Sequence, residues 1–228
     1  IYTIALHDLD YFKYTLPTIE RYAERIGGDF VKVETPNINF DTLHYEKFYT
    51  ADLLERYERV LLLDADVIVT PHAENIFKVY PDKNKVYGYN ENGEGAMDRD
   101  GFVESVLHDG VEWDKSNGKY VYFNAGVVLM SNTFKDILKD YKGIKEKPEW
   151  DKSVGLSSQT LLNYMTFKNK IPFGNLSYSF NRMFLGESDI NCARLEADFI
   201  HYAGHDTFSG GDKLKTIKHD YEKLWGKK

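Results

Sequence analysis

The stretch RVLLLDADVIVT, residues Arg59 to Thr70, places two carboxylates, Asp64 and Asp66, inside a run of aliphatic residues. The apolar run predicts a buried strand over Val60–Val69, and residues two apart on a strand point to the same side. Two like charges at this spacing raise each other's pKa, and burying them unpaired is costly. A divalent cation, a pair of basic side chains, or exposure at the strand's carboxyl end would each relieve that cost.

Ligands of open α/β sheets bind in the crevice beyond the carboxyl ends of the strands. Carboxylates at that place, with open positions on the ion, are suited to holding Mg²⁺ or Mn²⁺ against phosphate oxygens. The alternative is a solvated strand end, where the aspartates accept hydrogen bonds from nearby backbone N–H groups. The Asp-x-Asp spacing alone leaves both interpretations open.

The elements around this stretch alternate between strand and helix patterns. Runs rich in β-branched and apolar residues predict strands, and apolar residues at helical spacing predict helices. The expected strands are Ile1–Leu6, Asp29–Glu34, Val60–Val69, Lys85–Tyr89, Tyr120–Ser131 and Asp198–Gly204. The expected helices are Tyr14–Ile26, Tyr45–Arg56, Thr133–Tyr141 and Ser157–Phe167, with a short one near Phe102–Leu107. This alternation predicts parallel strands with helices on the faces of the sheet.

Composition restricts the class of protein. The 228 residues, 42% of them hydrophobic, suit a single domain over 1–228, and the start at Ile1 is compatible with a domain cut from a longer chain. The net charge of −7 argues against nucleic acid as a partner. The single cysteine excludes an internal disulfide, and no apolar stretch reaches the roughly 20 residues needed to span a bilayer. We therefore expect a cytoplasmic location with no transmembrane segment.

The C-terminal sequence KLKTIKHDYEKLWGKK interleaves lysines with large apolar residues. It predicts a solvated helix that packs through Tyr221, Leu224 and Trp225. The alternative is peripheral contact of this basic and aromatic tail with an anionic membrane or an acidic acceptor.

Five motifs, in order along most of the chain, resemble those of GT-A fold glycosyltransferases, above all family 8, the glycogenin and lipooligosaccharide galactosyltransferase type. This resemblance implies an α/β fold with a Rossmann-like, mostly parallel central sheet and helices on both faces. It also implies a UDP-sugar-dependent hexosyl- or deoxyhexosyltransferase. Such an enzyme uses Mn²⁺, or Mg²⁺, and moves the sugar to a hydroxyl of a glycan or other acceptor.

The first three motifs lie in the N-terminal third. The loop HDLDYF resembles a uridine-binding loop, which assigns Asp8 to the uracil edge and Tyr11 to stacking on the base. The helix YEKFYTADLLERY resembles the one whose basic residue contacts the diphosphate or sugar, here Lys47. The resemblance assigns Asp64 and Asp66 to the metal and the two phosphates.

The other two motifs come from later strands. FNAGVVLMS is similar to the family's Phe-Asn-Ala-Gly-Val strand, so Asn124 and the backbone near Ala125 are expected to contact the sugar. Gly126 would allow close approach of the backbone. FIHYAGH resembles the strand whose first histidine is the third metal ligand, here His201 and not His205. An imidazole among oxygen ligands favours Mn²⁺ over Mg²⁺.

The chain departs from the family at two places. The family usually has Asp-Gln-Asp-x-x-Asn where this chain has SSQTLLN, so Gln159 is kept but Ser158 and Thr160 replace acids. Because the first acid commonly bonds the sugar's hydroxyls, its loss at Ser158 puts donor identity in doubt. A deoxysugar or a pentose would need that carboxylate less.

The family's Lys-Pro-Trp, whose lysine grips the diphosphate, is also absent, and Lys213, Lys215 or His205 would have to replace it.

Mechanistically, the resemblance implies retention at the anomeric carbon, with Gln159 near the β face of the sugar. Lys47 and the ion bound by Asp66 would stabilise the departing diphosphate in the transition state. Inversion would instead need a carboxylate base, for which Asp98, Glu91 and Glu94 are unplaced candidates.

Two rival functions remain. A metal-dependent nucleotidyltransferase would require a glycine-rich phosphate loop after the first strand, and HDLDYF contains no glycine. A silent domain that binds sugar nucleotide or glycan predicts UDP binding without UDP release.

Overall fold

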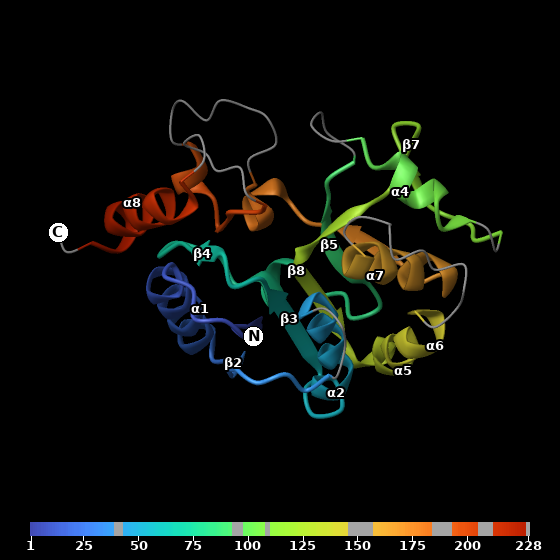
Figure 1. The fold of residues 1–228 in the computed structure, drawn as a ribbon, viewed down its shortest axis with the longest axis horizontal. Helices are drawn as coiled ribbons and strands as arrows, with labels where there is room; N and C mark the ends of the chain where they lie inside the picture. The colour runs from blue at the N-terminus through green and yellow to red at the C-terminus, as the bar shows by residue number, and fades with distance from the viewer. Residues whose placement is uncertain are drawn as a thin grey trace. The chain divides into compact units, whose positions relative to one another are not determined.

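The computed structural model describes residues 1–38, 43–92, 98–107, 110–145, 157–183, 193–204 and 212–226. Six strands form the central sheet in the order β2-β1-β3-β8-β5-β9 (Figure 1). The strands are β1 Tyr2–Ile4, β2 Val31–Val33, β3 Arg59–Leu63, β5 Val86–Asn90, β8 Phe123–Ser131 and β9 Phe173–Asn175. β1 pairs in parallel with β2 and β3, and β5 pairs in parallel with β9 but antiparallel with β8. The sheet is therefore mixed and mostly parallel.

The chain forms two compact units, each built from separated segments. The first contains Ile1–Pro36, Leu62–Pro81 and Leu176–Lys228, and the second contains Asn37–Leu61 and Asp82–Asn175. The expectation of a single domain over 1–228 stays a prediction.

In the first unit, helix α1 (Phe12–Ile26) buries Ile19, Tyr22 and Ala23 on one face, which is the spacing that predicted it. It ends at Gly27, whose φ of 73° is the left-handed conformation that glycine adopts without steric cost. This unit also holds α3 (Ile76–Val79), the 3-10 helices η4 (Tyr178–Asn181) and η5 (Ala193–Glu196), and the strands β4 (Val67–Val69) and β10 (Phe199–His201).

The prediction of one strand over Val60–Val69 is wrong. β3 ends at Leu63 and β4 begins at Val67, and the residues between them form a turn in which the Val67 N–H donates to the Asp64 carbonyl at 3.2 Å. β4 does not continue in the six-stranded sheet but pairs antiparallel with β10. Asp64 and Asp66 therefore lie between two strands, where their carboxylates do not have to be buried within a sheet.

The second unit contains most of the other helices, whereas the C-terminal helix belongs to the first unit. Its elements are η1 (Leu43–Tyr49), α2 (Thr50–Leu53), α4 (Asp100–Glu104), η3 (Asn132–Phe134), α5 (Lys135–Lys139), α6 (Tyr141–Lys145) and α7 (Ser157–Lys168), with a small hairpin of β6 (Lys115–Ser116) and β7 (Lys119–Tyr120). α7 confirms the predicted helix and packs against β8 (Figure 1). The helix expected over Tyr45–Arg56 is a 3-10 helix followed by one short α-helical turn.

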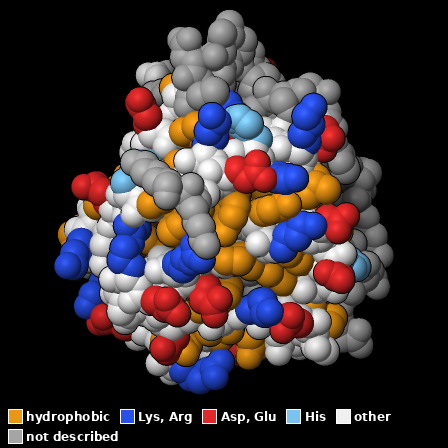
Figure 2. All heavy atoms as spheres, turned by 90° about the vertical axis from the view of Figure 1, so that its left-hand side faces the viewer, with side chains coloured by type: hydrophobic (Ala, Val, Ile, Leu, Met, Phe, Trp, Pro, Cys, Tyr) orange, Lys and Arg blue, Asp and Glu red, His pale blue; other side chains and the backbone are white. Residues whose placement is uncertain are grey.

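The C-terminal helix α8 (Lys213–Trp225) packs against α1 through its apolar residues. Ile217 is buried, the rings of Tyr221 and Tyr14 lie 5.5 Å apart, and the Trp225 indole N–H donates to the Val69 carbonyl at 3.1 Å. These contacts are those of a solvated helix with an inward apolar face. Acidic and basic side chains alternate around the apolar ones on the side that carries α1 and α8 (Figure 2). Membrane contact by this tail stays a prediction.

A buried ion pair also holds α8 in place. Asp220 is inaccessible to solvent and accepts two hydrogen bonds from the Arg194 guanidinium, at 2.7 and 2.9 Å. The Tyr202 hydroxyl donates to the same carboxylate at 2.8 Å. This network ties α8 to η5 and to the end of β10. Among the described helices, none has the length and apolarity to cross a bilayer, and the cytoplasmic location stays a prediction.

Candidate functional site

The pairing of β4 with β10 brings two distant motifs together in the first unit. In this antiparallel ladder His201 lies opposite Val67, the residue after Asp66. The Tyr202 N–H extends the contact by donating to the Asp66 carbonyl at 3.0 Å. The register of one short ladder therefore places the His201 imidazole beside the two carboxylates.

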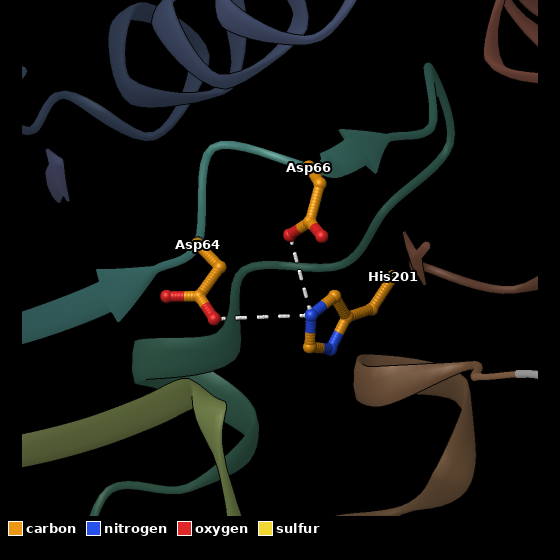
Figure 3. A group of neighbouring side chains, drawn as sticks. All are labelled: Asp64, Asp66 and His201. Atoms are coloured by element: carbon orange, nitrogen blue, oxygen red, sulfur yellow. Dashed lines mark ion pairs between the residues drawn. The ribbon is translucent and has the colours of Figure 1, made fainter. Parts of the chain in front are cut away.

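Asp64, Asp66 and His201 converge on one point (Figure 3). The His201 Nε2 lies 3.3 Å from Asp66 Oδ1 and 3.9 Å from Asp64 Oδ2, and one ligand atom from each residue lies within 4.8 Å of the others. The His201 side chain is 3% exposed, whereas those of Asp66 and Asp64 are 14% and 27% exposed, so solvent reaches the carboxylates. Within the described part of the chain, this is the one group of three such side chains.

The donor set fits a divalent cation. Ligand atoms that share an ion at about 2.1 Å lie about 3–4 Å apart, close to the distances found here. The other ring nitrogen of His201, Nδ1, lies 2.8 Å from Asn181 Oδ1. Because a carbonyl oxygen can only accept, Nδ1 donates to it, and this hydrogen bond directs Nε2 toward the carboxylates. One nitrogen with two oxygens is a set that suits Mn²⁺ better than Mg²⁺ or Ca²⁺.

A lysine from α8 also reaches this cluster. Lys213 Nζ lies 2.6 Å from Asp66 Oδ2, the carboxylate oxygen that does not face His201. Burial alone would raise the pKa of Asp66, but attraction to His201 and Lys213 holds that pKa well below its ordinary value. Of the three residues considered for the diphosphate, Lys213 is at the cluster, Lys215 is exposed on α8, and His205 lies outside the described residues.

The two residues of the predicted uridine loop have different surroundings. Tyr11 is half-buried beside the cluster: Lys213 Nζ lies 5.2 Å from its ring centroid, and burial with the charges of Asp66 and Asp64 raises its pKa. Asp8 is exposed and lines a cavity of about 780 Å³ together with residues that follow β1, residues of α1 and residues of β2 and its flanks; Tyr11 does not line this cavity. That volume lies in the range of small-molecule sites.

In the second unit, the first residues of β8 meet α7 through paired amides. The Ala125 N–H donates to Gln159 Oε1 at 3.0 Å, and the Gly126 N–H donates to Asn124 Oδ1 at 2.8 Å. Lys47 Nζ donates to the Ala125 carbonyl at 2.9 Å. The β5–β8 ladder shifts register between Gly88 and Asn90, an irregularity of the kind that is common next to functional sites.

Glu91, which sequence reasoning left as an unplaced base candidate, is the centre of this network. Its side chain is 2% exposed, and its carboxylate accepts from Arg99 Nε at 2.7 Å, Gln159 Nε2 at 3.0 Å and Asn124 Nδ2 at 3.0 Å. Glu91 lies two residues after the predicted strand Lys85–Tyr89, but no local feature of the sequence indicated its partners. Of the other candidates, Asp98 is exposed and Glu94 lies outside the described residues.

The positions where the expected acids are replaced lie on α7, in which residues 158–167 are all buried. Ser158 is largely buried, and Thr160 Oγ1 lies 2.7 Å from the buried Tyr122 hydroxyl. Asn163 accepts from the Phe123 N–H at 2.8 Å and therefore ties α7 to β8. Thr160 thus serves packing.

Comparison with known proteins identifies relatives of this arrangement. The family model described as Glycosyl transferase family 8 matches residues 10–206. No curated protein matches the sequence.

Solved structures resemble the chain over most of its length. A glycosyltransferase involved in glycosylation of the major capsid of PBCV-1 has a TM-score of 0.62 at 16% identity, covering 96% of this chain and 97% of that one. Galactosyltransferase LgtC, solved with donor and acceptor sugar analogs, has a TM-score of 0.60 at 17% identity, covering 98% and 95%. GlyE of Streptococcus pneumoniae TIGR4 has a TM-score of 0.55 at 20% identity, covering 97% and 52%. These likenesses, with the sheet order, confirm the predicted GT-A fold.

Proposed function

The chain belongs to glycosyl transferase family 8 and is a glycosyltransferase, and we propose that it moves a sugar from a UDP-sugar to an acceptor hydroxyl. We further propose that the reaction depends on a divalent cation and retains configuration at the anomeric carbon. The observation that carries this proposal is the convergence of Asp64, Asp66 and His201 through the β4–β10 ladder. The family resemblance assigned these three residues to one ion before their geometry was known.

The nucleoside is assigned to the end of β1. Asp8 lines a cavity large enough for a nucleoside, and a carboxylate can accept from the imide N–H of uracil. Tyr11 offers a ring on which a base can stack. Binding energy from this part of the donor would hold the reacting bond in position.

Stabilisation of the leaving group is assigned to the cluster and its lysine. A bound Mn²⁺ would neutralise negative charge on the diphosphate, and Asp64, Asp66 and His201 would hold that ion. Lys213 already directs its ammonium at this place and is the lysine that we assign to the diphosphate. Such charges matter most in the transition state, because the negative charge of the leaving group grows as the glycosidic bond stretches.

The sugar is assigned to Asn124, Ala125, Gly126, Gln159 and Ser158, and Lys47 supports this segment through the Ala125 carbonyl. Gln159 Oε1 accepts from the Ala125 N–H and faces Asn124 Nδ2 at 3.4 Å, so its oxygen is already engaged by the protein. We therefore propose that Gln159 acts at the β face mainly by holding β8 in position. The acceptor hydroxyl would give its proton to the departing diphosphate as the new glycosidic bond forms.

A panel of UDP-sugars tests the proposal directly. UDP release should require Mn²⁺, stop on addition of EDTA, and fall at least about 100-fold in Asp66→Ala, since a metal ligand is lost. Comparing hexose, deoxyhexose and pentose donors shows what the serine at position 158 selects, and NMR of the product shows its anomeric configuration.

Other results would point elsewhere. UDP binding without release, with acceptors present, would favour the silent binding domain. Full activity of Asp66→Ala would overturn the assigned site.

A further inference from the structure

The Lys213 ammonium lies beside both places where the proposed ligands, a divalent cation and uracil, would bind. Its ammonium lies 2.6 Å from Asp66 Oδ2 and 5.2 Å from the centroid of the Tyr11 ring. The first distance is a close ion pair, and the second lies within the range of cation–π attraction. One side chain therefore contacts both a proposed metal ligand and the ring proposed for the base.

A divalent cation at the cluster would be disfavoured by this ammonium. Asp66 is the carboxylate shared between them, and two positive charges on one largely buried carboxylate repel each other strongly. Lys213 is 23% exposed and sits at the first turn of α8, so its flexible side chain has solvent to move into.

The Lys213 ammonium would also hinder a base from stacking on Tyr11. The ring is half-buried and packs against the core cluster that includes Ile68, Ile200 and Ile217, which leaves it limited accessible area. Lys213 lies over that ring, so stacking and the cation–π contact compete for the same aromatic surface.

We propose that Lys213 is a displaceable internal cation that couples the two halves of the donor site. Binding of a divalent cation withdraws Lys213 from Asp66 and, with it, from Tyr11, so the cation strengthens the binding of the base. By thermodynamic linkage the base strengthens cation binding by the same factor. This inference rests on the proposed function, which places the cation at the cluster and uracil on Tyr11.

The first experiment measures Mn²⁺ binding alone by the EPR signal of free Mn²⁺. Lys213→Met removes the competing ammonium but keeps the length of the side chain, and we expect it to bind Mn²⁺ at least about fivefold more tightly than the natural protein. Lys215→Met removes the same charge two residues away on α8, from an exposed side chain, and should change Mn²⁺ affinity by less than about twofold.

The second experiment measures the binding of uridine, by ligand-observed NMR, with and without saturating Mn²⁺. Uridine has no phosphate, so Mn²⁺ can affect its affinity only through the protein. In the natural protein and in Lys215→Met, Mn²⁺ should tighten uridine binding about fivefold or more. In Lys213→Met uridine should bind tightly without Mn²⁺, and in Lys213→Arg the coupling should persist because the charge is kept.

Measuring UDP binding to the natural protein in the presence of Mn²⁺ distinguishes failure of the proposed function from failure of the inference about Lys213. If UDP fails to bind, both the proposed function and this inference are overturned. If UDP binds but uridine affinity is independent of Mn²⁺, or if the coupling survives in Lys213→Met, the inference about Lys213 is wrong and the proposed function stands.

Discussion

Replacing Glu91 by glutamine should destabilise the protein well beyond the usual effect of an isosteric change. The carboxylate accepts from Arg99, Gln159 and Asn124, and the backbone N–H groups of β8 fix both amides with their NH₂ groups toward Glu91. A carboxamide at this position would place its own NH₂ group against one of these donors, and neither amide is free to turn. It would also remove the negative charge that faces Arg99 Nε at 2.7 Å.

The magnitude follows from burial. Removing one partner of a buried ion pair typically costs about 3–5 kcal/mol. The Arg99 side chain is 16% exposed and keeps some contact with water, so the low end applies, about 3 kcal/mol. For a chain of this size that corresponds to a fall in Tm of about 6–12 °C.

Thermal and urea unfolding measure this effect against a matched control. Glu46 is equally buried, at 2% exposed, and accepts from the neutral Asn37 N–H, Asn37 Nδ2 and Ile38 N–H groups at 2.9–3.0 Å. Glu46→Gln makes the same chemical change where these three donors are neutral, and we expect a loss of about 1 kcal/mol.

A functional measurement accompanies the stability assay. UDP affinity of Glu91→Gln should stay within about twofold of the natural value, because UDP is assigned to other residues, while the extra affinity contributed by the sugar should fall. If Glu91→Gln proves as stable as the natural protein, or no less stable than Glu46→Gln, the charge on Glu91 is not what organises this network.

Three further perturbations test separate parts of the structure. Asn181→Ala removes the hydrogen bond that orients His201 and should weaken Mn²⁺ binding about 10- to 100-fold by EPR; unchanged affinity would mean that packing alone orients the ring. Asp220→Asn removes the negative charge that the buried Arg194 guanidinium contacts and should lower the free energy of unfolding in urea by about 3–5 kcal/mol, whereas an unchanged urea midpoint would show that the pair is dispensable. Hydrogen bonds from Lys135 and Lys139, the first and last residues of α5, lower the pKa of Glu55 from 4.5 to about 2. Their stabilisation of the folded state is therefore present above pH 4.5 and is lost as the pH falls toward 2. The stability difference between the natural protein and Glu55→Gln should therefore be small at pH 7 and decrease as the pH falls from 4.5 toward 2; a difference that is as large at pH 2 as at pH 7 would contradict this assignment.

Much of the fold was predictable because its elements carry local patterns. The apolar spacing of α1, the apolar residues of α7 and the apolar runs of β3 and β8 are local features of the sequence. The break between β3 and β4 was not predictable in this way. The break arises because β4 pairs with β10, which lies far along the sequence. The sequence did not indicate it, because the apolar residues on both sides of the two aspartates have the pattern of one continuous strand.

The candidate site also contains residues that the sequence identified and residues whose partners only the structure showed. Asp64, Asp66 and His201 were assigned from motif order alone, and the structure brings them together. Lys213 was one of three candidates until its contact with Asp66 distinguished it, and Glu91 had no assigned partner until β5, β8 and α7 were packed together.

The sequence by itself determined the α/β class, the family and the residues that can ligate a cation, because residue type and order along the chain carry that information. The tertiary structure decided which charged side chains meet. The register of β10 on β4 places His201 beside the aspartates, Lys213 reaches Asp66, and the Glu91 carboxylate lies between the amides of Asn124 and Gln159. Such contacts join residues separated by many others, and the energy of a charge depends on burial and on partners that no local pattern specifies.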